Sequence, residues 1–234
     1  MNFAEMSIKR VQSHGEYLSR HFDFAGKATV DIGCGTGDFV RWMTEQGAAA
    51  TGIDTVEMIA RAAEAPKIGN EKYLVGTAQA VPVEDACADA ALYIASFHHV
   101  PELEMPRALA ECGRILKPGG AAIFVEPVGE TGSYYEVVRL VEDEREIQAK
   151  AYAAIAAAEN AGFRMTAEGT YYLERSFQDY LRLLDLFVGD ASARLDIAAA
   201  AHAVTERLSR AADIPFESYR HRSICRMNIL RKSD

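Results

Sequence analysis

The chain has 234 residues, of which 49% are apolar and 25% charged, a composition that excludes a disordered chain and suits one globular domain. Its 25 basic and 34 acidic side chains give a net charge of −9, and no run of Lys or Arg forms a basic stripe. These charges exclude a polyanion such as nucleic acid as the expected partner.

The cysteines and the first residues indicate where the protein resides. Cys34, Cys87, Cys112 and Cys225 lack the paired spacing of a zinc site or a disulfide framework, which favours a reducing compartment. The first residues lack a basic stretch followed by an apolar one, and no run of about 18 apolar residues occurs. We therefore expect a cytoplasmic protein with no membrane partner.

The N-terminal segment carries a helical pattern. Ile8, Val11 and Leu18 recur among charged residues at a loose helical spacing and predict a helix within residues 5–22. We expect residues 1–25 to form an N-terminal helical cap.

Short apolar runs alternate with helical patterns in the first half of the chain. The expected strands are residues 28–32, 49–53, 72–75, 88–95 and 121–125. Between the first two runs, Phe39, Trp42 and Met43 recur at i, i+3 and i+4, and after the second run Thr55 is placed as a helix N-cap. Because parallel strands need crossover segments of this kind, the alternation predicts a doubly wound α/β fold with helices on both faces of the sheet.

The pattern changes after Pro127. A helix at 147–158, a strand at 165–173, helices within 176–212 with a break near Gly189, and a last strand at 219–230 are expected. The sequence thus predicts a mostly parallel, seven-stranded sheet in a single domain, residues 1–234, with a helical insertion at 176–213 before the last strand.

A glycine-rich turn follows the first expected strand and reads DIGCGTG from Asp31 to Gly37. Glycines let a ligand approach the main chain, and open α/β sheets bind ligands at this edge. A dinucleotide loop of the form G-x-G-x-x-G would need glycine at position 38, where Asp38 would repel a pyrophosphate. The turn therefore favours a cofactor without phosphates.

Five motifs in order resemble the class I S-adenosylmethionine-dependent methyltransferases, especially their ubiquinone-biosynthesis-like small-molecule branch. The motifs are VDIGCGTGDF, GIDTVEMIARA, GTAQAVPVEDACAD, ASFHHV and ECGRILKPGGAAIFVEP, which together cover residues 30–127. The resemblance implies a Rossmann-like methyltransferase fold and binding of S-adenosylmethionine, with S-adenosylhomocysteine as its product.

The resemblance also implies the residues that bind this cofactor. They are Asp31, Gly33, Cys34, Gly35, Gly37, Asp54, Thr55, Thr77, Ala78 and Ser96. The glycines would line the methionine part, and Asp31 would hold its amino group. Asp54 would accept both ribose hydroxyls, because a carboxylate offers two oxygens to a diol. Thr77 departs from the family, which often has Asp there, and a hydroxyl accepts the adenine amine more weakly.

Two adjacent histidines are the candidate catalytic residues. His98 and His99 follow the expected strand at 88–95, and a histidine near its ordinary pKa of 6.5 can act as a general base. Alternatively, they hydrogen-bond the backbone of their loop. We expect no metal site, because adjacent histidines rarely converge on one ion and no third ligand is evident. Glu111 and Arg114, spaced i, i+3, predict an ion pair on a helix surface.

The helical insertion is a candidate lid over the methyl acceptor. Phe177, Tyr180, Leu184 and Phe187 are spaced to form one apolar face. That face could instead pack on the sheet or on a second subunit of a homodimer.

We expect in-line methyl transfer to an oxygen, nitrogen or carbon nucleophile of a small molecule. Such a displacement requires alignment of the nucleophile with the methyl group and exclusion of water. The alternative is a methyltransferase-like protein that binds the cofactor without turnover, as a regulatory or assembly partner. The sequence leaves the acceptor open.

Overall fold

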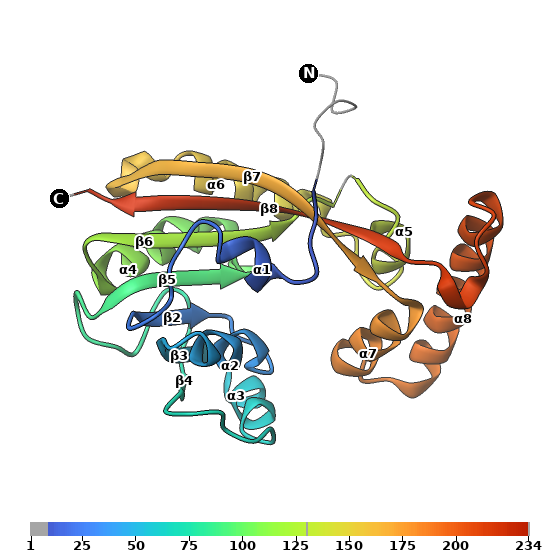
Figure 1. Ribbon diagram of the computed structural model, residues 1–234, viewed down its shortest axis with the longest axis horizontal. Helices are drawn as coiled ribbons and strands as arrows, with labels where there is room; N and C mark the ends of the chain where they lie inside the picture. Colours follow the sequence, from blue (N-terminus) through green and yellow to red (C-terminus); the bar gives the residue numbers. More distant parts are fainter. Residues whose placement is uncertain (1–8, 130, 234) are drawn as a thin grey trace. The chain divides into compact units, whose positions relative to one another are not determined.

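The centre of the fold is an eight-stranded sheet in the order β1-β7-β8-β6-β5-β2-β3-β4. The computed structural model describes residues 9–129 and 131–233 (Figure 1). The strands are β1 (Lys9–Arg10), β2 (Ala28–Ile32), β3 (Ala49–Asp54), β4 (Lys72–Val75), β5 (Ala88–Ile94), β6 (Leu116–Pro127), β7 (Phe163–Arg175) and β8 (His221–Lys232).

Helices connect these strands. The α-helices are α1 (His14–Leu18), α2 (Asp38–Glu45), α3 (Val56–Ala62), α4 (Met105–Ile115), α5 (Tyr135–Val138), α6 (Arg145–Ala156), α7 (Phe177–Phe187) and α8 (Ala191–Ala211). Short 3₁₀ turns add η2 (Phe97–His99), η3 (Glu102–Glu104), η4 (Ala158–Ala161) and η5 (Phe216–Ser218). None of the helices in the described part of the chain combines the length and the apolar character that a bilayer-spanning segment requires.

Strands β2 to β6 are parallel to one another, whereas β8, which lies beside β6, runs the other way. In the central pair, Asp31 of β2 lies opposite Gly52 of β3 and Leu92 of β5. At β8, the Ser233 N–H donates to the Gly162 carbonyl (2.8 Å) and the Thr166 hydroxyl donates to the Ile229 carbonyl (3.1 Å), an antiparallel register. The arrows in Figure 1 show the same directions. The mostly parallel, doubly wound α/β fold predicted from the sequence is thus confirmed.

The N-terminal segment differs from its prediction. The expected helix over 5–22 is wrong in extent: within the described residues only His14–Leu18 is α-helical. Residues 9–10 instead form β1, which adds an eighth strand, and the Val11 N–H donates to the Tyr172 carbonyl of β7 (3.0 Å). Ser13 then begins the helix as its N-cap, because its side chain accepts the Glu16 N–H. Residues 5–8 of the expected helix lie outside the described residues.

Contacts group the chain into two compact units. Unit 1 holds the described residues of 1–12, 127–146 and 170–225, and unit 2 holds 13–126, 147–169 and 226–234. Strands β7 and β8 run through both units, and the interpretation of the chain as one domain stays a prediction.

The core of unit 2 contains most of the sheet. Tyr93 of β5 and Phe124 of β6 stack with ring centroids 4.9 Å apart, and Phe97 contacts both rings edge-on. Residues of α4 and α6 join the same buried cluster. A parallel sheet buried in this way holds the carboxyl ends of its strands in fixed relative positions.

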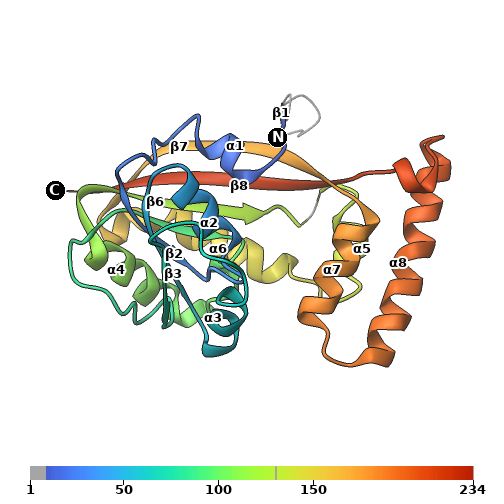
Figure 2. The ribbon, with the colours of Figure 1, turned by 60° about the horizontal axis from the view of Figure 1, so that its bottom comes forward.

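The core of unit 1 is helical. Helices α7 and α8 lie side by side (Figures 1 and 2), and Val137, Tyr180, Leu184 and Ala201 form their buried cluster. Of the apolar face expected on the insertion, Tyr180 and Leu184 are buried, whereas Phe187 is 64% exposed. The break expected near Gly189 is present, since Asp190 caps the start of α8.

The ion pair predicted between Glu111 and Arg114 is present on α4 (2.9 Å), and it also contacts the loop that follows β4. Arg114 donates to the Glu111 carboxylate and to the carbonyls of Val81 and Val83, at 2.7 to 2.9 Å. Glu111 in turn accepts the Val81 N–H (3.0 Å). The pair therefore holds the loop after β4 against helix α4.

We expect Arg114→Met to lower the free energy of unfolding by about 1–3 kcal/mol, because it removes charge-assisted hydrogen bonds and leaves two carbonyls without their donor. Arg107→Met on the same helix is the control, since Arg107 is 67% exposed and lies 3.9 Å from Glu104. Urea unfolding measures both variants. Equal losses would show that Arg114 contributes no more than a surface charge.

Candidate functional site

A cavity of about 170 Å³ opens at the carboxyl ends of the central strands, within unit 2. The turn after β2, the end of β3, the loop after β4 and the segment after β5 each supply part of its wall. Seven of the residues singled out in the sequence line it: Gly33, Asp54, Thr55, Thr77, Ala78, Ser96 and His99. Parallel strands that end at one edge bring these distant residues together.

Asp54 ties the glycine turn to the end of β3. Its Oδ2 accepts the Gly35 N–H and its Oδ1 accepts the Thr55 N–H, each at 2.7 Å. Thr55 also caps α3, as predicted, because its hydroxyl accepts the Met58 N–H. Each oxygen of the Asp54 carboxylate can accept further hydrogen bonds from a ligand in the cavity.

Position 33 requires glycine, because the turn after β2 lies very close to Ser96 after β5. Its φ is +77°, and a Cβ at this position would lie 2.5 Å from the Ser96 Cβ. The Ser96 hydroxyl donates to the Ile32 carbonyl (2.7 Å), which holds the two strand ends together. A side chain at position 33 would therefore separate the strands and fill the cavity mouth.

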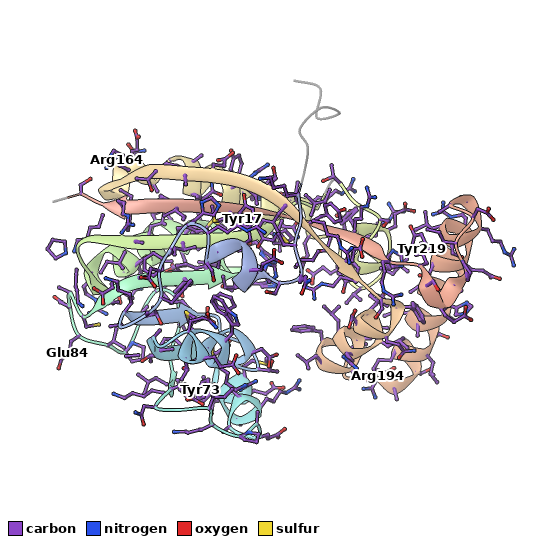
Figure 3. The ribbon with its side chains drawn as sticks, viewed as in Figure 1. Tyr17, Tyr73, Glu84, Arg164, Arg194 and Tyr219 are labelled. Atoms are coloured by element: carbon purple, nitrogen blue, oxygen red, sulfur yellow. The ribbon has the colours of Figure 1, made fainter. Side chains whose placement is uncertain are left out.

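The cavity wall does not include all of the predicted cofactor residues. Gly37 packs under Tyr73 (labelled in Figure 3), since a Cβ there would lie 2.7 Å from the tyrosine ring. The Cys34 Sγ occupies the space beside Gly52, and burial raises the pKa of its thiol. A Cβ added at Gly35 would meet only the Met58 methyl group, at 3.8 Å. In the structure these residues shape the turn, and their contact with a cofactor stays a prediction.

Asp31 is the most unusual group of the site. Its side chain is buried at 1% exposure, and its Oδ1 has no hydrogen-bond partner among the described residues. Burial, and secondarily the charge of Asp54, raise the pKa of Asp31 to about 7. A buried carboxylate with an unpartnered oxygen is costly unless a cation or a donor binds to it, so this position suits the ammonium group of a ligand.

The two histidines differ in their surroundings. His99 lines the cavity, whereas His98 is 3% exposed and its Nδ1 pairs with Oε2 of Glu126. Oε1 of Glu126 accepts the Phe97 N–H (2.9 Å), and the two imidazole rings lie 4.1 Å apart. Glu126 was not predicted from the sequence, although it directly follows the apolar run at residues 121–125 and precedes Pro127.

The raised pKa of Asp31 predicts how stability depends on pH. Between about pH 4 and 7 the folded protein keeps a proton on Asp31 that the unfolded chain has released, so wild-type stability falls as pH rises through this range. Asp31→Asn is neutral throughout. Relative to wild type it should gain on the order of 2–4 kcal/mol between pH 4 and 8.

Chemical unfolding at several pH values measures this gain. Thr29→Val is the matched control, because Thr29 lies on the same strand, is buried, and has an Oγ1 that is unpartnered among the described residues and does not titrate. Its effect should not vary with pH. A difference between Asp31→Asn and wild type that is flat with pH would contradict the assigned pKa.

Comparisons with known proteins agree with this geometry. Residues 30–124 match the family model described as "Methyltransferase domain". A malonyl-[acyl-carrier protein] O-methyltransferase of Pectobacterium atrosepticum is 36% identical over 101 residues, 43% of this chain and 38% of that protein. A ubiquinone biosynthesis O-methyltransferase of Chromobacterium violaceum is 31% identical over 115 residues, 47% of this chain and 48% of that protein. The chain thus spans less than half of the length of these relatives.

A solved structure extends the likeness in fold to nearly the whole chain. An S-adenosylmethionine-dependent methyltransferase of Methanosarcina mazei superposes with a TM-score of 0.59 and 17% identity, covering 95% of this chain and 99% of the other. The resemblance to the class I S-adenosylmethionine-dependent methyltransferases that was stated from the sequence is thus confirmed over residues 30–124, the part of the chain that matches the methyltransferase domain model.

Proposed function

We propose that this protein transfers a methyl group from S-adenosylmethionine to an oxygen atom of a small molecule. The observation that carries the proposal is the buried carboxylate of Asp31, whose Oδ1 lacks a partner among the described residues beneath the glycine turn. The names of the two sequence relatives, both O-methyltransferases, support oxygen over nitrogen or carbon as the acceptor.

The residues of the cavity, together with the buried Asp31 next to them in the chain, fit this cofactor in three places. Asp31, which does not itself line the cavity, would supply a counter-charge for an ammonium group, and Asp54 would supply two acceptor oxygens for the ribose diol. Thr77 and Ala78, on the loop that Arg114 holds, would contact the adenine, and Ser96 would lie beside the methionine amine. The bound cofactor supplies a methyl group already activated by a sulfonium, so these residues need only bind, orient and exclude water.

The histidine pair supplies a route for the acceptor proton. The contact between Nδ1 of His98 and the Glu126 carboxylate orients the His98 ring beside that of His99. His99, which lines the cavity, is the residue that we assign to take the proton of an acceptor hydroxyl. Glu126 and His98 then act as positioning residues for the segment that carries His99.

We also propose that helices α7 and α8 form a lid that contacts the acceptor. Phe177 packs on Tyr180, His202 and Phe216 within unit 1, whereas Phe187 exposes most of its ring. An exposed aromatic side chain can bind another molecule without disturbing its own helix.

The direct test of function is turnover. Protein incubated with methyl-labelled S-adenosylmethionine and a panel of small phenols, carboxylic acids and amines should label an oxygen acceptor, detected by mass. Tight cofactor binding without any labelled product across metabolite extracts would favour the alternative, a cofactor-binding regulatory or assembly partner.

Asp54→Asn tests the cofactor cavity. Loss of a charged acceptor should weaken S-adenosylhomocysteine binding by about 1.5–3 kcal/mol in calorimetry. Asp38→Asn, in the same turn but exposed and paired with Arg41, should leave the affinity unchanged. Equal affinities for both variants, with the fold intact, would refute the ribose role.

His99→Asn tests the base. We expect kcat to fall by about 10²–10⁴-fold with little change in cofactor affinity. Glu126→Gln should lower kcat less and shift the acidic limb of the pH–rate profile, because it perturbs the ring beside His99. Should His98→Asn alone carry the large loss, the base would be His98; wild-type rates in both histidine variants would leave only a structural role.

Phe187→Ala tests the lid. It should raise the acceptor KM by more than about tenfold while stability and cofactor affinity are retained, because the ring is exposed. Phe177→Ala, by contrast, should lower stability, since that ring packs within unit 1. Unchanged acceptor kinetics in Phe187→Ala would place the acceptor site elsewhere.

A further inference from the structure

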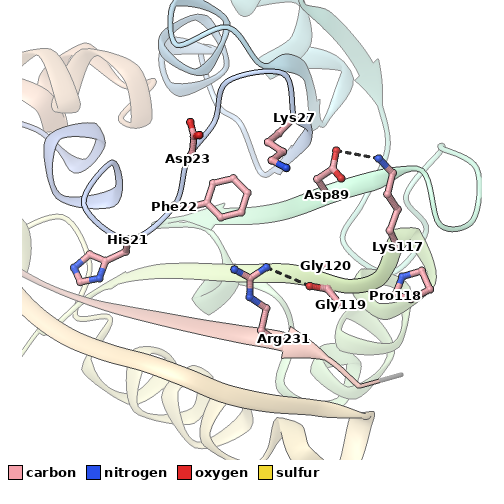
Figure 4. A pocket seen from close by; sticks show the side chains of 10 residues that line it. All are labelled: His21, Phe22, Asp23, Lys27, Asp89, Lys117, Pro118, Gly119, Gly120 and Arg231. Atoms are coloured by element: carbon pink, nitrogen blue, oxygen red, sulfur yellow. Dashed lines mark hydrogen bonds and ion pairs between the residues drawn. The ribbon is translucent and has the colours of Figure 1, made fainter.

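A second cavity, of about 340 Å³, lies within unit 2 at the amino ends of the parallel strands, the ends opposite the glycine turn (Figure 4). Lys27 precedes β2, Asp89 is the second residue of β5, and Lys117 is the second residue of β6. Arg231 closes the set from the end of the antiparallel strand β8. Strand β2 has five residues and therefore spans roughly 16 Å between this edge and the glycine turn, so the two cavities are separate sites.

Both carboxylates of this cavity, those of Asp89 and Asp23, already accept hydrogen bonds from nearby backbone N–H groups. The Asp89 carboxylate accepts the Ala28 N–H (2.8 Å) and pairs with the Lys117 ammonium (2.9 Å), and these contacts, in that order, lower the pKa of Asp89. The Asp23 carboxylate accepts the Ala25 N–H (3.1 Å) within its own turn. Lys117 is thus neutralised by Asp89, as the dashed line in Figure 4 marks.

Two cations remain. Neither Lys27 nor Arg231 forms an ion pair with a carboxylate anywhere in residues 9–129 and 131–233. The Nη1 of Arg231 donates to the Gly119 carbonyl (3.2 Å), which orients the guanidinium and leaves most of its five N–H groups for another acceptor. Two like charges that face one hollow repel each other, and this repulsion is relieved when an anion enters.

The cavity wall beside Lys27 and Arg231 leaves room for a ligand. The register between β5 and β6 shifts between Ala88 and Ala90, so the segment from Lys117 to Gly120 bulges away from the sheet. Gly119 has φ +70°, and a Cβ there would meet no atom within 4 Å, which leaves room at the rim. Phe22, packed edge-on against Phe24, adds an apolar wall.

We propose that this cavity binds the phosphate group of a small phosphomonoester, at a site separate from that of the cofactor. The Lys27 ammonium and the Arg231 guanidinium can each donate to a different oxygen of a phosphate group, which offers three terminal oxygens where a carboxylate offers two. The volume of the cavity and the Phe22 ring suit an apolar body attached to the phosphate. The net charge of −9 makes this local pair of cations selective for a small anion over a polyanion.

Calorimetric titration with inorganic phosphate and with phenyl phosphate tests the proposal on the full chain. Both probes should bind, phenyl phosphate more tightly because its ring can lie against the part of Phe22 that lines the cavity. Lys27→Gln and Arg231→Gln should each weaken binding by at least about tenfold, the loss of one charge-assisted contact. The affinity for S-adenosylhomocysteine should stay within about twofold of wild type in both variants, as expected for independent sites.

Controls make the result decisive. Lys67→Gln removes an exposed lysine outside the cavity and should leave the affinity for phenyl phosphate unchanged. Arg231→Lys, which keeps the charge, should retain more affinity than Arg231→Gln and guards against a loss caused by misfolding. The proposal is overturned by absence of saturable binding, by an equal loss in Lys67→Gln, or by competition between phenyl phosphate and S-adenosylhomocysteine.

Discussion

The buried carboxylate of Asp31, in the middle of the parallel sheet, constrains the strand ends that line the proposed cofactor cavity. Asp31 lies between β3 and β5 with almost no exposure, and its pKa is raised to about 7. Such a group destabilises the folded protein whenever it is ionised and alone. A cationic group that binds beside Asp31 stabilises its ionised form. The unfavourable free energy of burying the charge is then offset, and this favours binding.

The other features of this edge hold that carboxylate and its surroundings in place. The Asp54 carboxylate fixes the backbone of the glycine turn, and the Ser96 hydroxyl fixes the end of β2 against β5. Glu126 does the same for the segment after β5, through the Phe97 N–H and His98. Each of these contacts joins the ends of two strands, so the cavity is shaped by backbone positions that the buried sheet determines.

Much of this arrangement could be predicted from the sequence, because it depends on local patterns. The strands β2 and β4 begin and end where the apolar runs do, and Thr55 caps α3 as its position indicated. Contacts between distant residues could not be predicted. Glu126 and His98 are 28 residues apart, and Arg114 reaches carbonyls more than 30 residues away.

The N-terminal error has a similar cause. Residues 9–10 are polar and carry no strand pattern of their own, yet they form β1 because β7 offers an edge to pair with. Helix α5 was missed because its four residues are too few to show a helical period. In both cases tertiary contacts decide the conformation, and the propensity of the segment alone does not.

The most direct test of the central claim is the affinity for S-adenosylhomocysteine as a function of pH. If Asp31 must ionise to hold the ammonium group, binding releases a proton, and the dissociation constant should rise by up to about tenfold per pH unit below pH 7. Asp31→Asn should bind more weakly at pH 7 and lose this dependence. A dissociation constant that varies with pH equally in wild type and in Asp31→Asn, or in neither, would contradict the account.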